Sequence, residues 1–149
     1  MHGLPFELQG RVVPGKQLGS KLGFPTANIA YDPADRPWPP EGVYAGVARL
    51  EDDVRDYVCI LNQGCHPTAP GGAPTVEAHL LGYPNPPLYG RKLSLSYRTF
   101  LRAETRFPSL EALQNQLGQD RLNALAWARE QAPELLPPIE SEGAKDGTV

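Results

Sequence analysis

The sequence predicts a mainly β fold with helices at its C-terminal end, and three observations support this. First, the 149 residues include 17 prolines and 15 glycines, and these residues separate short apolar runs, as in β barrels and β sandwiches with many turns. Second, the last of these runs alternates apolar and polar residues over positions 92–100, which is the pattern of a half-buried strand. Third, the apolar spacing becomes helical after Pro108. The length suits one domain with a single core.

Five strands are predicted from these runs, at residues 7–13, 43–50, 54–61, 75–81 and 92–100. The polar EDD between the second and third runs predicts a hairpin turn. Residues 31–42 are rich in proline and offer few amide donors, so we expect a loop there. Residues 67–74, with the sequence PTAPGGAP, form a second expected loop. Residues 22–29 are interpreted as an irregular extended loop.

Two helices are predicted near the C-terminus. Ser109 is a candidate N-cap of the first helix, which should end near Gly118. The second should run from about Asp120 to Ala132. We expect the five leucines of these helices to pack on the sheet as core, namely Leu110, Leu113, Leu117, Leu122 and Leu125. Ala126 shares one face with Leu122 and Leu125. Residues 1–132 should form the domain, and the polar residues 133–149 a disordered tail.

Composition excludes several classes of function. The formal net charge of −3 gives no basic face for a nucleic-acid backbone, so we expect no nucleic-acid partner. The first ten residues lack the features of a signal peptide, and no run approaches the roughly 18 apolar residues of a membrane span. We therefore expect a cytoplasmic protein. Cys59 and Cys65 lack a recognised metal-ligand spacing and are expected to be free buried thiols, and the three histidines, His2, His66 and His79, need no metal role.

The segment LGFPTANI at residues 22–29 is the main candidate for a ligand site. Pro25 favours extended backbone before it, so Thr26 and Asn28 can project to the same side. Glycines at positions 15, 19 and 23 would let the backbone approach a ligand closely. This combination suggests a phosphate and metal site. The same residue types are also ordinary turn formers, and the segment matches neither the Walker loop nor the GxGxxG fingerprint.

Six ordered blocks resemble the riboflavin kinase (flavokinase) family. They are GRVVPGKQLGSKLGFPTANI, EGVYAG, NQGCHPT, VEAHLL, LYG and FLRAETRFPSLEALQNQLGQD, and together they span roughly residues 8–130. The resemblance implies a six-stranded antiparallel Greek-key barrel with C-terminal α-helices. It also implies transfer of the γ-phosphoryl group of ATP to the 5′-hydroxyl of riboflavin with Mg²⁺, which gives FMN and ADP.

The resemblance also implies roles for individual residues. Glu77 matches the general base, although a glutamate within an apolar strand can equally be a solvent-facing residue. Thr26 and Asn28 match the metal ligands, and a hydroxyl and an amide carbonyl suit Mg²⁺. The positions that match nucleotide contacts are Gly15, Lys21, Gly23, Leu80, Gly82 and Tyr89. The positions that match flavin contacts are Arg102, Glu104 and Phe107. From residue type alone, Lys21 could instead be a solvated surface residue and Phe107 plain core.

The resemblance favours a stand-alone kinase domain without the FMN adenylyltransferase domain that often precedes it in bacteria. We expect a monomer that acts on ATP and riboflavin. A second interpretation stays open because many bacterial members carry an aspartate at the position of Gly82. In that interpretation the barrel only binds a flavin or a nucleotide and regulates another process.

Overall fold

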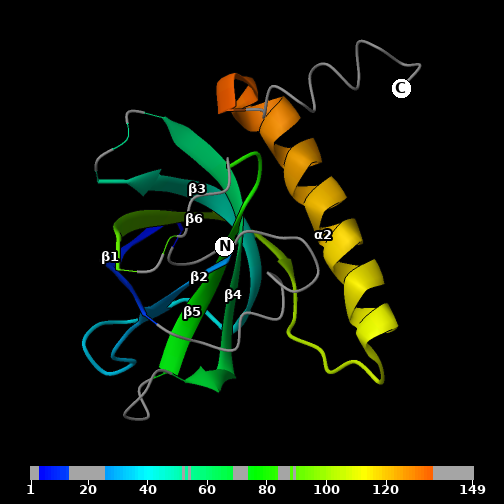
Figure 1. Cartoon of the computed structure of the whole chain (residues 1–149), viewed down its shortest axis with the longest axis horizontal. Helices are drawn as coiled ribbons and strands as arrows, with labels where there is room; N and C mark the ends of the chain where they lie inside the picture. Colours follow the sequence, from blue (N-terminus) through cyan, green and yellow to red (C-terminus); the bar gives the residue numbers. More distant parts are fainter. Residues whose placement is uncertain are drawn as a thin grey trace.

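The structure is a computed structural model and describes residues 4–13, 26–51, 53, 55–68, 74–83, 88 and 90–135, without the side chains of residues 65–68. Six strands form a closed barrel in the order β1-β2-β5-β4-β3-β6, and a single long helix lies beside it (Figure 1). The strands are β1 Phe6–Val13, β2 Thr26–Ala30, β3 Gly42–Leu50, β4 Asp56–Thr68, β5 Pro74–Leu80 and β6 Lys92–Arg102.

Every pair of neighbouring strands is antiparallel, and β1 closes the barrel by pairing with both β2 and β6. Strand β2 pairs with β5 rather than with β3, which follows it in sequence. The chain therefore crosses the end of the barrel between β2 and β3, as in a Greek key. The predicted fold class, a six-stranded antiparallel barrel with C-terminal helical structure, is confirmed.

The barrel interior is filled by apolar and aromatic side chains from all six strands. Tyr44 and Tyr97 are fully buried there, with ring centroids 5.0 Å apart. Trp38, in the loop before β3, packs on Phe6 and Tyr31 with centroid distances of 4.6 Å and 4.4 Å. Because side chains occupy the interior, ligand chemistry has to lie on the outside of the barrel.

Two strand predictions need correction. Residues 26–30 form β2 rather than an irregular loop, because β1 and β5 supply a pairing partner on each side. Strand β4 starts at Asp56 instead of residue 54 and continues to Thr68, so it includes the first residues of the expected PTAPGGAP loop. Tertiary pairing outweighs local turn propensity in both places.

The helical prediction was wrong in number. One continuous helix, α2 (Leu110–Gln131), replaces the two expected helices and runs through Gly118; a short 3₁₀ turn, η1 (Pro133–Leu135), follows. The predicted cap is correct, since the amide of Ala112 donates to the Ser109 hydroxyl at 3.1 Å. The rest of the predicted tail lies outside the described residues.

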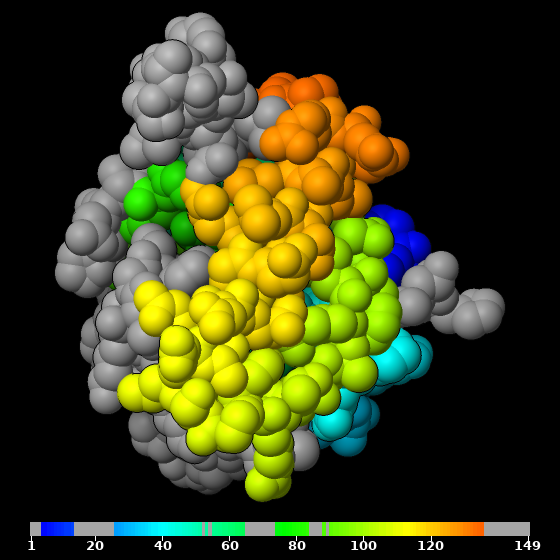
Figure 2. All heavy atoms as spheres, turned by 90° about the vertical axis from the view of Figure 1, so that its right-hand side faces the viewer, coloured from blue at the N-terminus to red at the C-terminus, as the bar shows by residue number. Residues whose placement is uncertain are grey.

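The helix covers part of the outer face of the barrel (Figure 2). A second apolar cluster joins α2 to β3 and β4, and its members are Val43, Ala45, Val58, Ile60, Leu81, Ala124, Leu125 and Ala128. Of the expected helical core residues, Leu117 and Leu125 are buried, whereas Leu110 and Leu122 are 60% and 57% exposed. The prediction that all five leucines would be core was therefore wrong for Leu110 and Leu122, which lie on the solvent side of the helix.

A charged pair also fixes the helix to the barrel. The Arg102 guanidinium at the end of β6 donates to both carboxylate oxygens of Asp120 on α2, at 2.8 Å and 2.7 Å. Gln116 donates to the same carboxylate at 2.9 Å. Cys59 is a free buried thiol, as predicted. No helix in the described residues is long and apolar enough to cross a membrane.

Candidate active site

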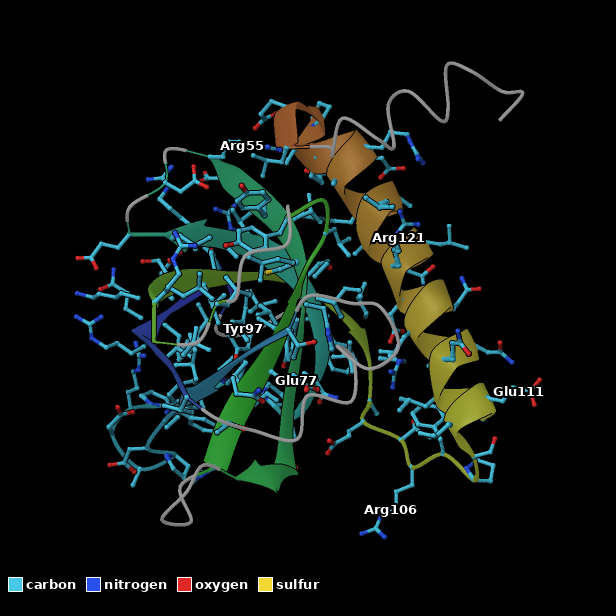
Figure 3. All side chains as sticks on the ribbon, viewed as in Figure 1. Arg55, Glu77, Tyr97, Arg106, Glu111 and Arg121 are labelled. Atoms are coloured by element: carbon cyan, nitrogen blue, oxygen red, sulfur yellow. The ribbon has the colours of Figure 1, made fainter. Side chains whose placement is uncertain are left out.

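The candidate site is built on β5, whose side chains alternate between the two sides of the barrel wall. Val76, Ala78 and Leu80 belong to the interior core. Glu77 and His79 therefore point outward, since successive side chains of a strand face opposite sides. Figure 3 labels Glu77 on β5 and Tyr97 inside the ring of strands. The apolar interior decides which face of β5 is inward, and the sequence left this open.

Strand pairing places the predicted catalytic and metal residues side by side. Asn28 lies directly opposite Glu77, and Thr26 directly opposite His79, in the pairing of β2 with β5. On the other side of β5, Asn62 of β4 lies opposite Glu77. Directly opposed residues share one face of a sheet, with Cβ atoms about 4.5–5.5 Å apart. The outer face therefore carries a row of Asn28, Glu77 and Asn62.

His79 links the two predicted functions. Its Nδ1 lies 3.2 Å from the Thr26 hydroxyl, and its Nε2 lies 3.7 Å from Oε1 of Glu77. Burial lowers the pKa of His79 to about 4, although the negative charge of Asp120 opposes this. The imidazole is therefore neutral at neutral pH, and its contact with Glu77 is not an ion pair.

The Glu77 carboxylate is mostly buried, with 15% of the side chain exposed. Desolvation raises the pKa of Glu77 above its ordinary value, because burial disfavours the charged form. A carboxylate with a raised pKa accepts a proton more readily than an exposed one. The position suits a general base.

Several polar atoms around Glu77 have no hydrogen-bond partner among the described groups. They are Nδ2 and Oδ1 of Asn28, Oδ1 of Asn62 and Oγ1 of Thr75. Asn28 is fully buried, and an unpaired buried amide is rare unless a ligand, ion or water completes it. A divalent cation such as Mg²⁺ prefers neutral and anionic oxygens, so the Asn28 carbonyl, with the Thr26 hydroxyl beside it, fits such an ion.

The predicted flavin residues lie between β6 and α2. Arg102 is paired with Asp120, and its guanidinium lies 5.8 Å from the ring centroid of Phe107. The Glu104 carboxylate packs against Gly64 of β4 so closely that a Cβ at position 64 would lie 2.0 Å from Oε2. Glu104 therefore approaches the strand that carries Asn62, and Arg102 helps to hold the helix on the barrel. The flavin roles of Arg102, Glu104 and Phe107 stay predictions.

The predicted nucleotide contacts are only partly described. Gly15, Lys21, Gly23 and Tyr89 lie outside the described residues. The Leu80 side chain is buried in the barrel interior, so a nucleotide contact there would have to involve its backbone. Gly82 is exposed in the turn after β5 with a φ of 77°, a conformation that glycine adopts readily. All six assignments stay predictions.

Two residues of the site escaped the sequence interpretation. His79 was given no role, and Asn62 was noticed only as part of a matching block. For His79, the period of two from Glu77 was an available signal. For Asn62, only the register between β4 and β5 reveals its place beside the carboxylate.

Comparisons with known proteins identify the family. A sequence model of the family described as "Flavokinase: Riboflavin kinase" matches residues 2–128. The bifunctional riboflavin kinase/FMN adenylyltransferase of Escherichia coli K12 is 41% identical over 123 residues, which are 82% of this chain and 38% of that protein. The "RNA-binding riboflavin kinase RibR" of Bacillus subtilis is 37% identical over 114 residues, 76% of this chain and 47% of that protein. The chain thus spans less than half the length of these relatives.

A solved structure shares the fold as well. The riboflavin kinase of Trypanosoma brucei has a TM-score of 0.63 and 25% identity, with 85% of this chain and 79% of that chain covered. The strand order, the placement of Glu77 among Asn28, Thr26 and His79, and the family match over residues 2–128 lead to one conclusion: this chain belongs to the riboflavin kinase family.

Proposed function

We propose that the protein is an ATP-dependent riboflavin kinase, which transfers the γ-phosphoryl group of ATP to the 5′-hydroxyl of riboflavin and releases FMN and ADP. The observation that carries the proposal is the row on the outer face. A mostly buried carboxylate stands directly beside a buried amide that has no hydrogen-bond partner among the described residues. A base beside oxygen ligands suited to a divalent cation is what phosphoryl transfer to a hydroxyl requires.

In this mechanism Glu77 accepts the proton of the 5′-hydroxyl as that oxygen forms its bond to the γ-phosphorus. The bond from the phosphorus to the β,γ-bridging oxygen breaks, and its electron pair leaves with ADP. Thr26 and Asn28 would hold Mg²⁺, which when bound neutralises charge on the phosphate oxygens. Neutral His79 orients the Thr26 hydroxyl through Nδ1 and adds no positive charge that would lower the basicity of Glu77.

The direct test is formation of FMN from riboflavin and ATP with a divalent cation, measured by chromatography. We expect FMN and ADP in equal amounts. If riboflavin binds but no FMN forms with any of several divalent metals, the chain is instead a flavin-binding regulatory module.

The metal role has its own test in Thr26→Ala with Asn28→Ala. Loss of both oxygen ligands should weaken ATP binding in the presence of Mg²⁺, whereas binding of riboflavin alone should change little. Calorimetric titrations with and without Mg²⁺ measure both effects. An ATP affinity in Mg²⁺ equal to that of the wild type would overturn the metal assignment.

We propose that the protein is a cytoplasmic monomer and that its only substrates are small molecules. The net charge of −3 argues against a nucleic-acid partner, because nucleic-acid binding depends mainly on a basic surface. Sedimentation tests the monomer, and an electrophoretic RNA-binding assay tests the expected lack of nucleic-acid binding.

A further inference from the structure

Asn62 is the neighbour of Glu77 on the side away from Asn28. It belongs to β4 and lies opposite Glu77 in the register, next to Val43 of β3 on the outer face. Two strand spacings, about 10 Å, separate the backbones of β2 and β4. The row from Asn28 to Asn62 is thus wide enough for a reacting centre over Glu77, with a different molecule on each side.

The Asn62 carbonyl has no hydrogen-bond partner among the described residues. Its Oδ1 is buried without such a bond, whereas the side-chain amide of the next residue, Gln63, donates to the Pro39 carbonyl at 2.9 Å. A buried carbonyl without a donor is destabilising, so an acceptor that the described residues leave unpaired is suited to a donor on a bound ligand.

The chemistry of this side favours hydroxyl groups over phosphate. Asn62 Oδ1 and the carboxylates of Glu77 and Glu104 are all acceptors, and Glu104 packs against Gly64, two residues along β4 from Asn62. The Glu104 carboxylate repels a phosphate, whereas O–H groups can donate both to Glu104 and to Asn62 Oδ1. A ligand rich in hydroxyl groups is therefore complementary to the β4 side.

The geometry of transfer leads to the same side. In phosphoryl transfer the attacking and leaving oxygens lie roughly in line on opposite sides of the phosphorus. With the nucleotide on the side of Thr26 and Asn28, the acceptor extends from Glu77 in the opposite direction, toward Asn62.

We propose that Asn62 is a specificity residue for the acceptor, and that its Oδ1 accepts a hydrogen bond from a hydroxyl of the acceptor's polyol chain. The identity of that acceptor as riboflavin rests on the proposed function. The polyol in question is then the ribityl chain, and Asn62 distinguishes flavins that carry this chain from those that lack it.

The test compares two ligands with two proteins. Riboflavin carries the ribityl chain, and lumiflavin has a methyl group in its place. Binding to the wild type and to Asn62→Ala is followed by flavin fluorescence without ATP. Loss of one neutral hydrogen bond should weaken riboflavin binding about two- to tenfold and leave lumiflavin binding unchanged. In steady-state assays the KM for riboflavin should rise and the KM for ATP should stay constant.

Asn123→Ala is the matched control, because this exposed asparagine on α2 interacts with Gln119; neither ligand should bind it differently from the wild type. If Asn62→Ala does not fold, Asn62→Ser carries the same comparison. Equal effects on the two flavins, or no effect on riboflavin, overturn the proposal.

Formation of FMN by the wild type is scored separately. FMN formation supports the kinase assignment even if the Asn62 proposal fails. If the wild type binds riboflavin but forms no FMN, the binding comparison still tests the role of Asn62.

Discussion

At the residue scale, burial of Glu77 favours its role as a base but lowers the stability of the folded protein. Its carboxylate is mostly buried and has neutral neighbours in Asn28 and His79, so among the described residues no positive charge offsets the lost hydration. Desolvation of this kind raises the pKa of Glu77 and makes the charged side chain unfavourable in the folded state at neutral pH. A catalytic base can thus lower the stability of the protein that carries it.

Glu77→Gln should separate these two properties. Glutamine has the same size without the charge, so the melting temperature at neutral pH should be equal to or higher than that of the wild type. Loss of a general base should lower kcat by about 10²- to 10⁴-fold, or roughly 3–5 kcal/mol. Thermal unfolding and FMN formation measure the two effects. Turnover close to that of the wild type would remove Glu77 from the mechanism.

At the scale of elements, the Arg102–Asp120 pair attaches α2 to the end of β6. Asp120 is 1% exposed and Arg102 21% exposed, so removal of either partner leaves the other charge at least partly buried. Arg102→Met should lower the free energy of unfolding by about 3–5 kcal/mol, because the buried Asp120 side chain would lose its charged partner. Urea unfolding measures this change.

A double variant tests the cause. Adding Asp120→Asn to Arg102→Met removes the buried charge and should restore part of the lost stability. Arg49→Met is the control, because in its ion pair Arg49 is 60% exposed and Asp56 25% exposed; it should change the free energy of unfolding far less than Arg102→Met does. Strictly additive single effects of Arg102→Met and Asp120→Asn would mean that the two charges are not coupled.

Elements also show the limits of sequence-based prediction. The period of two over residues 92–100 fixed β6 almost completely, and the composition gave the β class. Residues 26–30 alternate Thr26 and Asn28 with Ala27 and Ile29, but this pattern covers only five residues. They form a strand because β1 and β5 pair with them. Gly118 suggested a helix end, yet nothing lies within 4 Å of a Cβ at that position and α2 continues through it.

For the site, the family resemblance supplied Glu77, Thr26 and Asn28, and the register brought them together. The sequence could not show which face of β5 is inward, because both faces carry apolar residues. It could not place Asn62 and His79 in the site either, because their positions depend on pairing between distant segments.

At the scale of the whole molecule, barrel closure depends on close contact between β3 and β6. Gly46 lies at a register shift in this pairing, and a Cβ there would be 2.0 Å from the Ser96 carbonyl oxygen. Gly46→Ala should therefore force these strands apart and destabilise the fold by at least about 1–3 kcal/mol. Chemical denaturation gives the value.

Gly118→Ala is the opposite case and serves as the control. Its Cβ would meet no atom within 4 Å, and alanine favours a helix interior over glycine by roughly 0.5–1 kcal/mol. The melting temperature should rise by about 2–4 °C per kcal/mol for a domain of this size. A Gly46→Ala protein as stable as the wild type would show that the two strands can separate without loss.

The alternation of β5 also limits how this protein can change during evolution or engineering. A single residue inserted or deleted before Glu77 within the strand would turn the carboxylate into the apolar interior and bring Val76 or Ala78 to the reacting face. A substitution in β5 alters one side chain, whereas a change of length would move the polar side chains into the core and the apolar side chains to the outer face. Variation in length should therefore be confined to the segments between strands.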